Sequence, residues 1–91
     1  MVTERFACPC CGYKTYIEKP NGHYDICEVC FWEDDPNQLD DSDDEDGANK
    51  VSPKQGQRNF IEFGACETAM IENVRPPGND EQRDEDWEPL G

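Results

Sequence analysis

The first third of the chain combines short β-prone runs with turn residues. Residues 13–17 and 23–26 are rich in aromatic and β-branched side chains, and Pro20-Asn21-Gly22 between them is a strong turn signal. This pattern predicts a short β-hairpin. Because an isolated two-stranded hairpin is marginal in water, a further interaction must hold its two ends together.

A helix is predicted in the second half of the chain. The run Ser-Pro-Lys-Gln at residues 52–55 supplies an N-cap serine, a proline suited to the first helical position and a glutamine three residues after the cap. The helix should extend to Phe63 and end at Gly64. We expect Phe60 and Phe63 to pack on the hairpin, and residues 65–74 to add a second short helical turn.

Two further segments are dominated by acids. Residues 33–46 contain nine Asp or Glu residues and no Lys or Arg, and residues 80–88 contain six acids. We expect the first segment to be a loop and the second to be extended and flexible. The loop does not match a calcium EF-hand, because Glu45 and Val51 stand where that motif needs Gly and Glu.

These patterns divide the chain into four parts. They are a ribbon at residues 1–35, an acidic loop at 36–51, a helical segment packed on the ribbon at 52–75, and an acidic flexible tail at 76–91. The fold class expected is small α+β.

Composition limits how such a fold can be stabilised and what it can bind. The chain has 91 residues, of which 34% are hydrophobic and six are cysteines, and its net charge is -14. A core this small needs additional stabilisation, such as a disulfide or a bound metal ion. The acidic surplus excludes ordinary nucleic-acid binding and suits a basic protein partner. Without an apolar signal segment or a membrane-length apolar run, we expect no membrane association and a cytoplasmic protein with reduced thiols.

Four cysteines form two C-x-x-C pairs with 15 residues between the pairs. This spacing is typical of a zinc ribbon, since each pair directs two thiolates to one edge of a tetrahedral site. Gly12, directly after the first pair, permits the positive φ that closes such a turn. We therefore predict one Zn²⁺ bound by Cys8, Cys11, Cys27 and Cys30, in a rubredoxin-like hairpin with two cysteine knuckles.

Alternatives for these cysteines remain open. They are two disulfides, an iron site of the rubredoxin kind, and a redox-active C-x-x-C. Cys10 and Cys66 are expected to pack as small hydrophobic residues, and the alternative is a second metal site that they form with His23. His23 itself is expected to be an exposed strand residue.

The sequence resembles the bacterial cysteine-rich CPCC family. The resemblance rests on Cys8-Pro9-Cys10-Cys11-Gly12-Tyr13, on residues 24–35 and on Gly47-Ala48-Asn49, and it continues through residues 59–66 to 74–77. It implies no catalytic residue. Some family members lie near toxin and immunity genes, so the resemblance implies an inhibitor role.

An enzyme is not expected, because four cysteine ligands close the coordination shell and no nucleophile motif or phosphate loop is present. We expect instead a structural zinc protein that binds a basic partner, such as a bacterial toxin, and acts as an immunity or inhibitor protein. The expected contact surface consists of Phe31, Trp32, Glu33, Asp34 and Asp35. The alternative function is a rubredoxin-like iron electron carrier.

Overall fold

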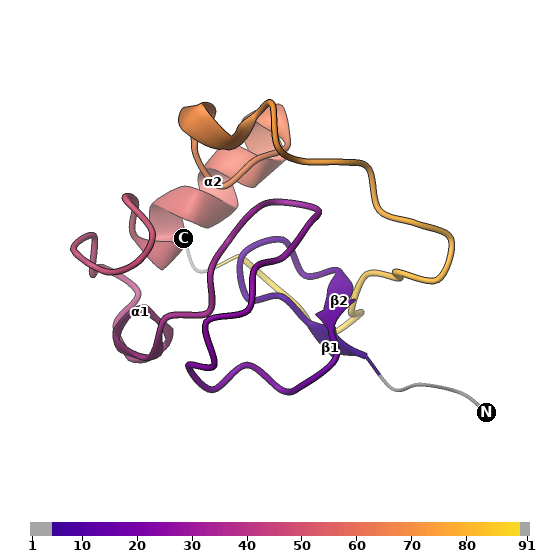
Figure 1. Cartoon of the computed structure of the whole chain (residues 1–91), viewed down its shortest axis with the longest axis horizontal. Coiled ribbons are helices and arrows are strands. Elements are labelled where there is room, and N and C mark those ends of the chain that lie inside the picture. Colours follow the sequence, from indigo (N-terminus) through magenta and orange to yellow (C-terminus); the bar gives the residue numbers. More distant parts are fainter. Residues whose placement is uncertain (1–4, 90–91) are drawn as a thin grey trace.

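The elements of this fold are short and are joined by long turns (Figure 1). The computed structural model describes residues 5–89. In chain order the elements are β1 (Phe6–Ala7), β2 (Lys14–Tyr16), α1 (Pro36–Asp40), α2 (Pro53–Phe63) and a 3-10 helix, η1 (Thr68–Met70). The first four residues of the predicted ribbon and the last two of the predicted tail lie outside the described residues. No helix within the described residues is both long and apolar enough to cross a membrane.

The two strands form an antiparallel hairpin around the first cysteine pair. Phe6 lies opposite Tyr16 and Ala7 lies opposite Lys14, with an irregularity between the two pairs. A strand was predicted at residues 13–17, and β2 lies there. Its predicted pairing with residues 23–26 was wrong, since those residues form only an isolated bridge between Ile26 and Glu33.

A buried carboxylate explains why residues 21–23 do not join a β ladder. Asp34 is fully buried, and its Oδ2 accepts the backbone N–H groups of Asn21, Gly22 and His23 at 3.0, 2.9 and 3.1 Å. The N–H of Asp34 also donates to the carbonyl of Asp25 at 3.0 Å. Because these amides donate to Asp34, they are not available to a β ladder.

The acidic segment contains a helix, so the prediction that it is entirely loop was wrong. Asp35 caps α1, and its Oδ1 accepts the N–H groups of Asn37 at 2.8 Å and Gln38 at 3.2 Å. Pro36 occupies the first helical turn. Burial by itself would raise the pKa of Asp35, but hydrogen bonds from the amides of Ala48, Gln38 and Asn37 lower it.

Two buried amides order the rest of this segment. Gln38 is 1% exposed, and its Nε2 donates to the carbonyls of Asp44, Asn49 and Val51. The Asn49 side chain in turn accepts from the N–H of Glu33 at 2.9 Å and donates to its carbonyl at 2.8 Å. The acidic loop is therefore tied at its base by polar side chains in the interior.

Helix α2 confirms the predicted bounds and caps. The Ser52 hydroxyl accepts the N–H of Gln55 at 3.1 Å, and Gly64 ends the helix with φ 84°. Phe60 packs against the core and meets Tyr13 edge to face at 6.1 Å. Gly56 allows the helix to approach the ribbon, since a Cβ there would lie 3.1 Å from Trp32.

The core is thin and rich in sulfur. It consists of Tyr16, Val29, Trp32 and all six cysteines. Partly buried side chains, among them Phe60 and Met70, pack against it. Because most of the core residues are small thiols, apolar burial alone provides little stabilisation.

The tail differs from its prediction as a flexible extension. The N–H of Lys14 donates to the carbonyl of Gln82 at 2.9 Å, and the N–H of Asp84 donates to the carbonyl of Gly12 at 2.8 Å. Trp87 then lies over Gly12, where a Cβ would come within 2.6 Å of its ring. Residues 82–87 of the tail are therefore packed against β2 and the first knuckle, which Figure 1 shows as the yellow segment crossing behind the strands.

Candidate metal centre

Four thiols meet at the centre of the molecule. The Sγ atoms of Cys8, Cys11, Cys27 and Cys30 all lie within 4.8 Å of one another, and all four residues are 0% exposed. Two of the sulfur separations, Cys8 to Cys30 and Cys11 to Cys27, are 3.6 and 3.7 Å. Four sulfurs at about 2.3 Å from one tetrahedral ion would be about 3.8 Å apart. The cage therefore fits a metal ion such as Zn²⁺ or iron.

The two cysteine knuckles have the same backbone hydrogen bonds. In the first, the N–H of Cys8 donates to the carbonyl of Tyr13 at 2.9 Å, and the N–H of Gly12 donates back to the carbonyl of Cys8 at 2.8 Å. In the second, the equivalent bonds join Cys27 to Trp32 at 2.9 Å and Phe31 to Cys27 at 2.6 Å. The knuckles thus present their thiols as two similar pairs facing each other.

The residue after each pair has a left-handed backbone. Gly12 has φ 79°, as the sequence predicts for a turn glycine, and Phe31 has φ 69°. A non-glycine residue pays roughly 1–2 kcal/mol for this conformation. The second knuckle therefore keeps its geometry in spite of a strained phenylalanine, whose ring packs against the core.

The pKa values of the four thiols are shifted in different directions. Burial raises the pKa of Cys8 and of Cys30. A hydrogen bond to Cys27 raises the pKa of Cys11. The pKa of Cys27 is lowered, because neighbouring thiols and the Thr15 hydroxyl, which donates at 3.1 Å, stabilise its thiolate. Four adjacent buried thiolates need a cation to coexist, so this chemistry also fits a metal ion.

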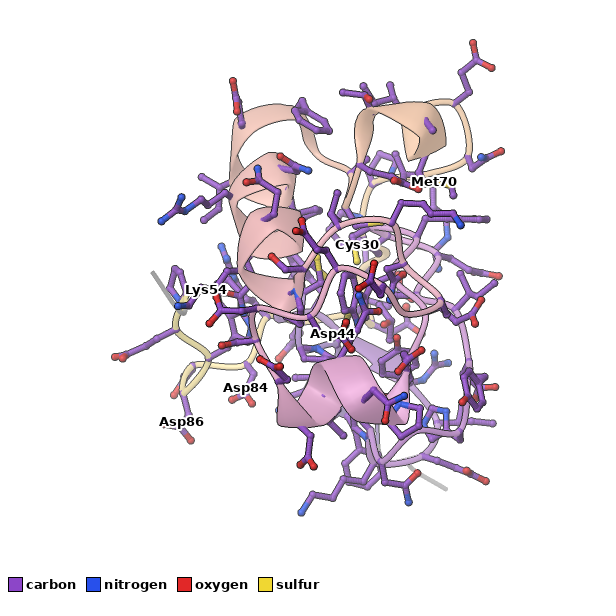
Figure 2. The ribbon with its side chains drawn as sticks, turned by 90° about the vertical axis from the view of Figure 1, so that its left-hand side faces the viewer. Cys30, Asp44, Lys54, Met70, Asp84 and Asp86 are labelled. Carbon is purple, nitrogen blue, oxygen red and sulfur yellow. The ribbon has the colours of Figure 1, made fainter. Side chains whose placement is uncertain are left out.

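Other parts of the chain hold each knuckle from outside. The carbonyl of Pro9 accepts from Gln57 Nε2 at 2.8 Å and from Trp87 Nε1 at 2.9 Å. The carbonyl of Cys30 accepts the N–H of Cys66 at 2.8 Å. Helix α2, the segment after it and the tail therefore all position the cage, and Figure 2 shows Cys30 in the middle of them.

The remaining cysteines and the histidine lie outside the group of four ligands. Cys10 and Cys66 are each 1% exposed, which agrees with their prediction as packing residues. Burial raises the pKa of Cys66 to about 12. The prediction of His23 as an exposed strand residue was wrong, because its side chain is 13% exposed and its ring lies edge to face with Tyr16 at 5.4 Å.

The predicted contact surface is largely interior. Trp32, Asp34 and Asp35 are 3%, 0% and 5% exposed, and only Phe31 and Glu33 are partly accessible. The correction has a physical cause, since these acids serve as acceptors for backbone amides of the chain itself. They cannot serve as an open acidic surface for a partner.

Sequence reasoning also missed side chains that position the site. Gln57 and Trp87 were not singled out, although both hold the first knuckle. For Gln57 a signal was present, because it is a polar residue next to Gly56 on a helix predicted to face the ribbon. Trp87 had only one signal, a large aromatic residue within an otherwise acidic tail.

The chain is similar to a known protein family. The model of the Cysteine-rich CPCC family matches residues 6–81, which includes all six cysteines. No curated protein matches the chain significantly.

Proposed function

We propose that this chain, which belongs to the Cysteine-rich CPCC family, holds one structural Zn²⁺ on its four clustered cysteines and serves as an acidic module that binds a basic protein. The observation that carries the proposal is the buried cage of Cys8, Cys11, Cys27 and Cys30 within a core composed mainly of thiols. The metal supplies the stabilisation that this core lacks.

A structural role suits this cage better than a catalytic one. Catalytic zinc sites keep a coordination position open for water or substrate, whereas four cysteines fill a tetrahedral shell. All four ligand residues are 0% exposed, so a substrate has no route to the ion. For the same reasons we propose that the protein is not an enzyme.

The interaction role rests on charge. The chain has 22 acidic and 8 basic residues. Asp40, Asp41, Asp43, Glu45 and Asp46, on α1 and after it, are exposed. A surface of this sign accelerates association with a basic protein and does so most strongly at low salt. We propose that this basic partner is a bacterial toxin. The chain would then act in the cytoplasm as an immunity or inhibitor protein.

The metal part of the proposal is tested by elemental analysis of the purified protein. We expect one zinc per chain, no visible colour, and loss of folded structure when a chelator removes the ion. If the purified protein is red and contains iron, the zinc assignment is wrong. The function to test would then be electron transfer by a rubredoxin-like iron site.

The interaction part is tested by affinity capture from the native host at low and at high salt, followed by binding measurements with each purified candidate. The expected result is a basic protein whose affinity falls with added salt. Binding that is indifferent to salt, or the absence of any basic partner, would contradict the interaction role and leave the metal assignment intact.

A further inference from the structure

A groove lies where the tail, α1 and the first turn of α2 meet. Its volume is about 520 Å³, within the roughly 300–1,000 Å³ usual for ligand sites. Figure 2 faces this side: the tail segment with Asp84 and Asp86 lies at the left, beside the first turn of α2 with Lys54, and α1 lies at the bottom. We call this feature the Trp87 groove.

The floor of the Trp87 groove is apolar and consists of Pro9, Trp32, Leu39 and Trp87. Trp87 is held in place by its hydrogen bond to the carbonyl of Pro9 at 2.9 Å. Leu39 projects from α1 with 43% of its surface exposed. An ordered indole ring, that of Trp87, beside an accessible leucine offers a preformed surface for an incoming apolar chain.

The rim of the groove carries charge of one sign. Asp40, Asp86 and Glu88 line it and are exposed. The turn that carries Asp86 is fixed, since its N–H donates to Asp84 Oδ1 at 3.0 Å. None of the lining residues in the described part of the chain is Lys, Arg or His. The electrostatic potential at the opening therefore favours a cation.

An apolar floor with an acidic rim matches a side chain that has an aliphatic stem and a cationic head. Lysine and arginine have both parts. The chain contains an internal example, because the guanidinium of Arg83 lies 4.7 Å from the Trp87 ring centroid and 5.6 Å from that of Tyr13. A purely apolar ligand would leave the rim unpaired, and an acidic ligand would be repelled.

We infer that the Trp87 groove receives a lysine or arginine side chain from a basic segment of the partner protein. This inference rests on the proposed function and gives it a contact site in place of the largely interior residues 31–35. The stem lies on Leu39 and Trp87, and the head is paired by the rim carboxylates.

The test uses the zinc-loaded full chain and a short synthetic peptide with the sequence Gly-Lys-Arg-Lys-Gly. Two control peptides replace its three cationic residues, one by norleucine, which keeps the stem, and one by diaminobutyrate, which keeps the charge on a shorter stem. We expect both controls to bind at least about fivefold more weakly. In a nitrogen–proton correlation spectrum, the indole N–H of Trp87 and the amide of Leu39 should shift most.

Matched variants separate the groove from general electrostatics. Asp86→Asn with Glu88→Gln should weaken binding about fivefold. Glu62→Gln with Glu72→Gln removes the same charge from exposed positions that lie outside the groove and outside the exposed acids of residues 40–46. This control pair should change affinity much less. Leu39→Ser, which leaves all charges in place, should also weaken binding.

Several results would overturn the inference. The first is an equal loss of peptide affinity in the two charge variants. The second is a diaminobutyrate peptide that binds as tightly as the Lys/Arg peptide. The third is a set of spectral shifts that centre on residues 41–46 in place of Trp87. If a captured basic partner binds the Asp86/Glu88 and Leu39 variants as tightly as the native chain, the groove is not the contact site, and the proposed function stands. If no basic partner binds with salt sensitivity, the proposed function itself fails.

Discussion

The indole nitrogen of Trp87 donates a hydrogen bond to the carbonyl oxygen of Pro9 at 2.9 Å, which joins positions 78 residues apart in the sequence. The same carbonyl accepts from Gln57 at 2.8 Å. The first cysteine knuckle is thus held by both α2 and the tail, and the acidic segment at the end of the chain belongs to the fold.

Replacing Trp87 by Phe should have a small effect by itself, because Gln57 still satisfies the Pro9 carbonyl. We expect a loss of about 1 kcal/mol in the free energy of unfolding, measured by urea titration of the zinc-loaded protein. Combining Trp87→Phe with Gln57→Ala removes both donors to this carbonyl, so the double variant should lose about 1 kcal/mol more than the sum of the single losses. Strictly additive losses would show that the two donors do not share one acceptor in solution.

Gly12 and Gly64 form a matched pair for substitution by alanine. Both have positive φ, 79° and 84°, but a Cβ at Gly12 would lie 2.6 Å from the Trp87 ring, whereas nothing lies within 4 Å at Gly64. Gly64→Ala should cost only the backbone strain of about 1–2 kcal/mol, and Gly12→Ala clearly more. In a Trp87→Ala background the extra cost at Gly12 should disappear. Equal costs in the native background would contradict the packing of Trp87 on the knuckle.

Two variants that truncate the Phe31 side chain should show an unusual order of stability. Its φ of 69° is strained for any residue with a Cβ. Phe31→Gly should therefore be more stable than Phe31→Ala by about 1 kcal/mol, although glycine normally destabilises by increasing the entropy of the unfolded chain. Unfolding in urea measures both variants against the same reference. The ordinary order, with alanine more stable, would mean that the second knuckle does not adopt this backbone.

The four clustered cysteines should differ sharply from the other two. Cys27→Ser should lose the bound metal and the folded N-terminal half, because metal binding and folding form one equilibrium in such sites. Cys10→Ser and Cys66→Ser should keep one metal per chain, with a cost of about 1–3 kcal/mol for a hydroxyl in a buried thiol position. Elemental analysis and circular dichroism measure both properties. A full complement of metal in Cys27→Ser would refute the ligand assignment.

Asp34→Asn tests the loop after β2. The native carboxylate is fully buried and accepts three consecutive backbone amides. An uncharged amide oxygen is a weaker acceptor, so we expect a loss of about 1–3 kcal/mol and faster hydrogen exchange at residues 21–23. Asp25→Asn, at an exposed neighbouring position, is the control and should have little effect. Unchanged exchange at residues 21–23 in Asp34→Asn would count against this role.

The structural features that depend on residues close together in the sequence were predictable. The two C-x-x-C pairs lie together in the structure, and α2 begins after Ser52 and ends before Gly64 as expected. Each of these features depends on a few adjacent residues: a knuckle on its cysteine spacing, a helix end on its cap. The sequence by itself therefore determined the candidate ligands and the main helix.

Only the tertiary structure decided which segments pair and which acids are buried. Phe6–Ala7 is too short to show a strand pattern, yet it is the partner of β2. Asp34 and Asp35 look like solvated acids, but each accepts backbone N–H groups from residues that the fold brings to it. Trp87 packs on Gly12 only because the chain returns across the first knuckle. These contacts depend on distances in space between residues far apart in the chain, and such distances are not encoded in any local pattern.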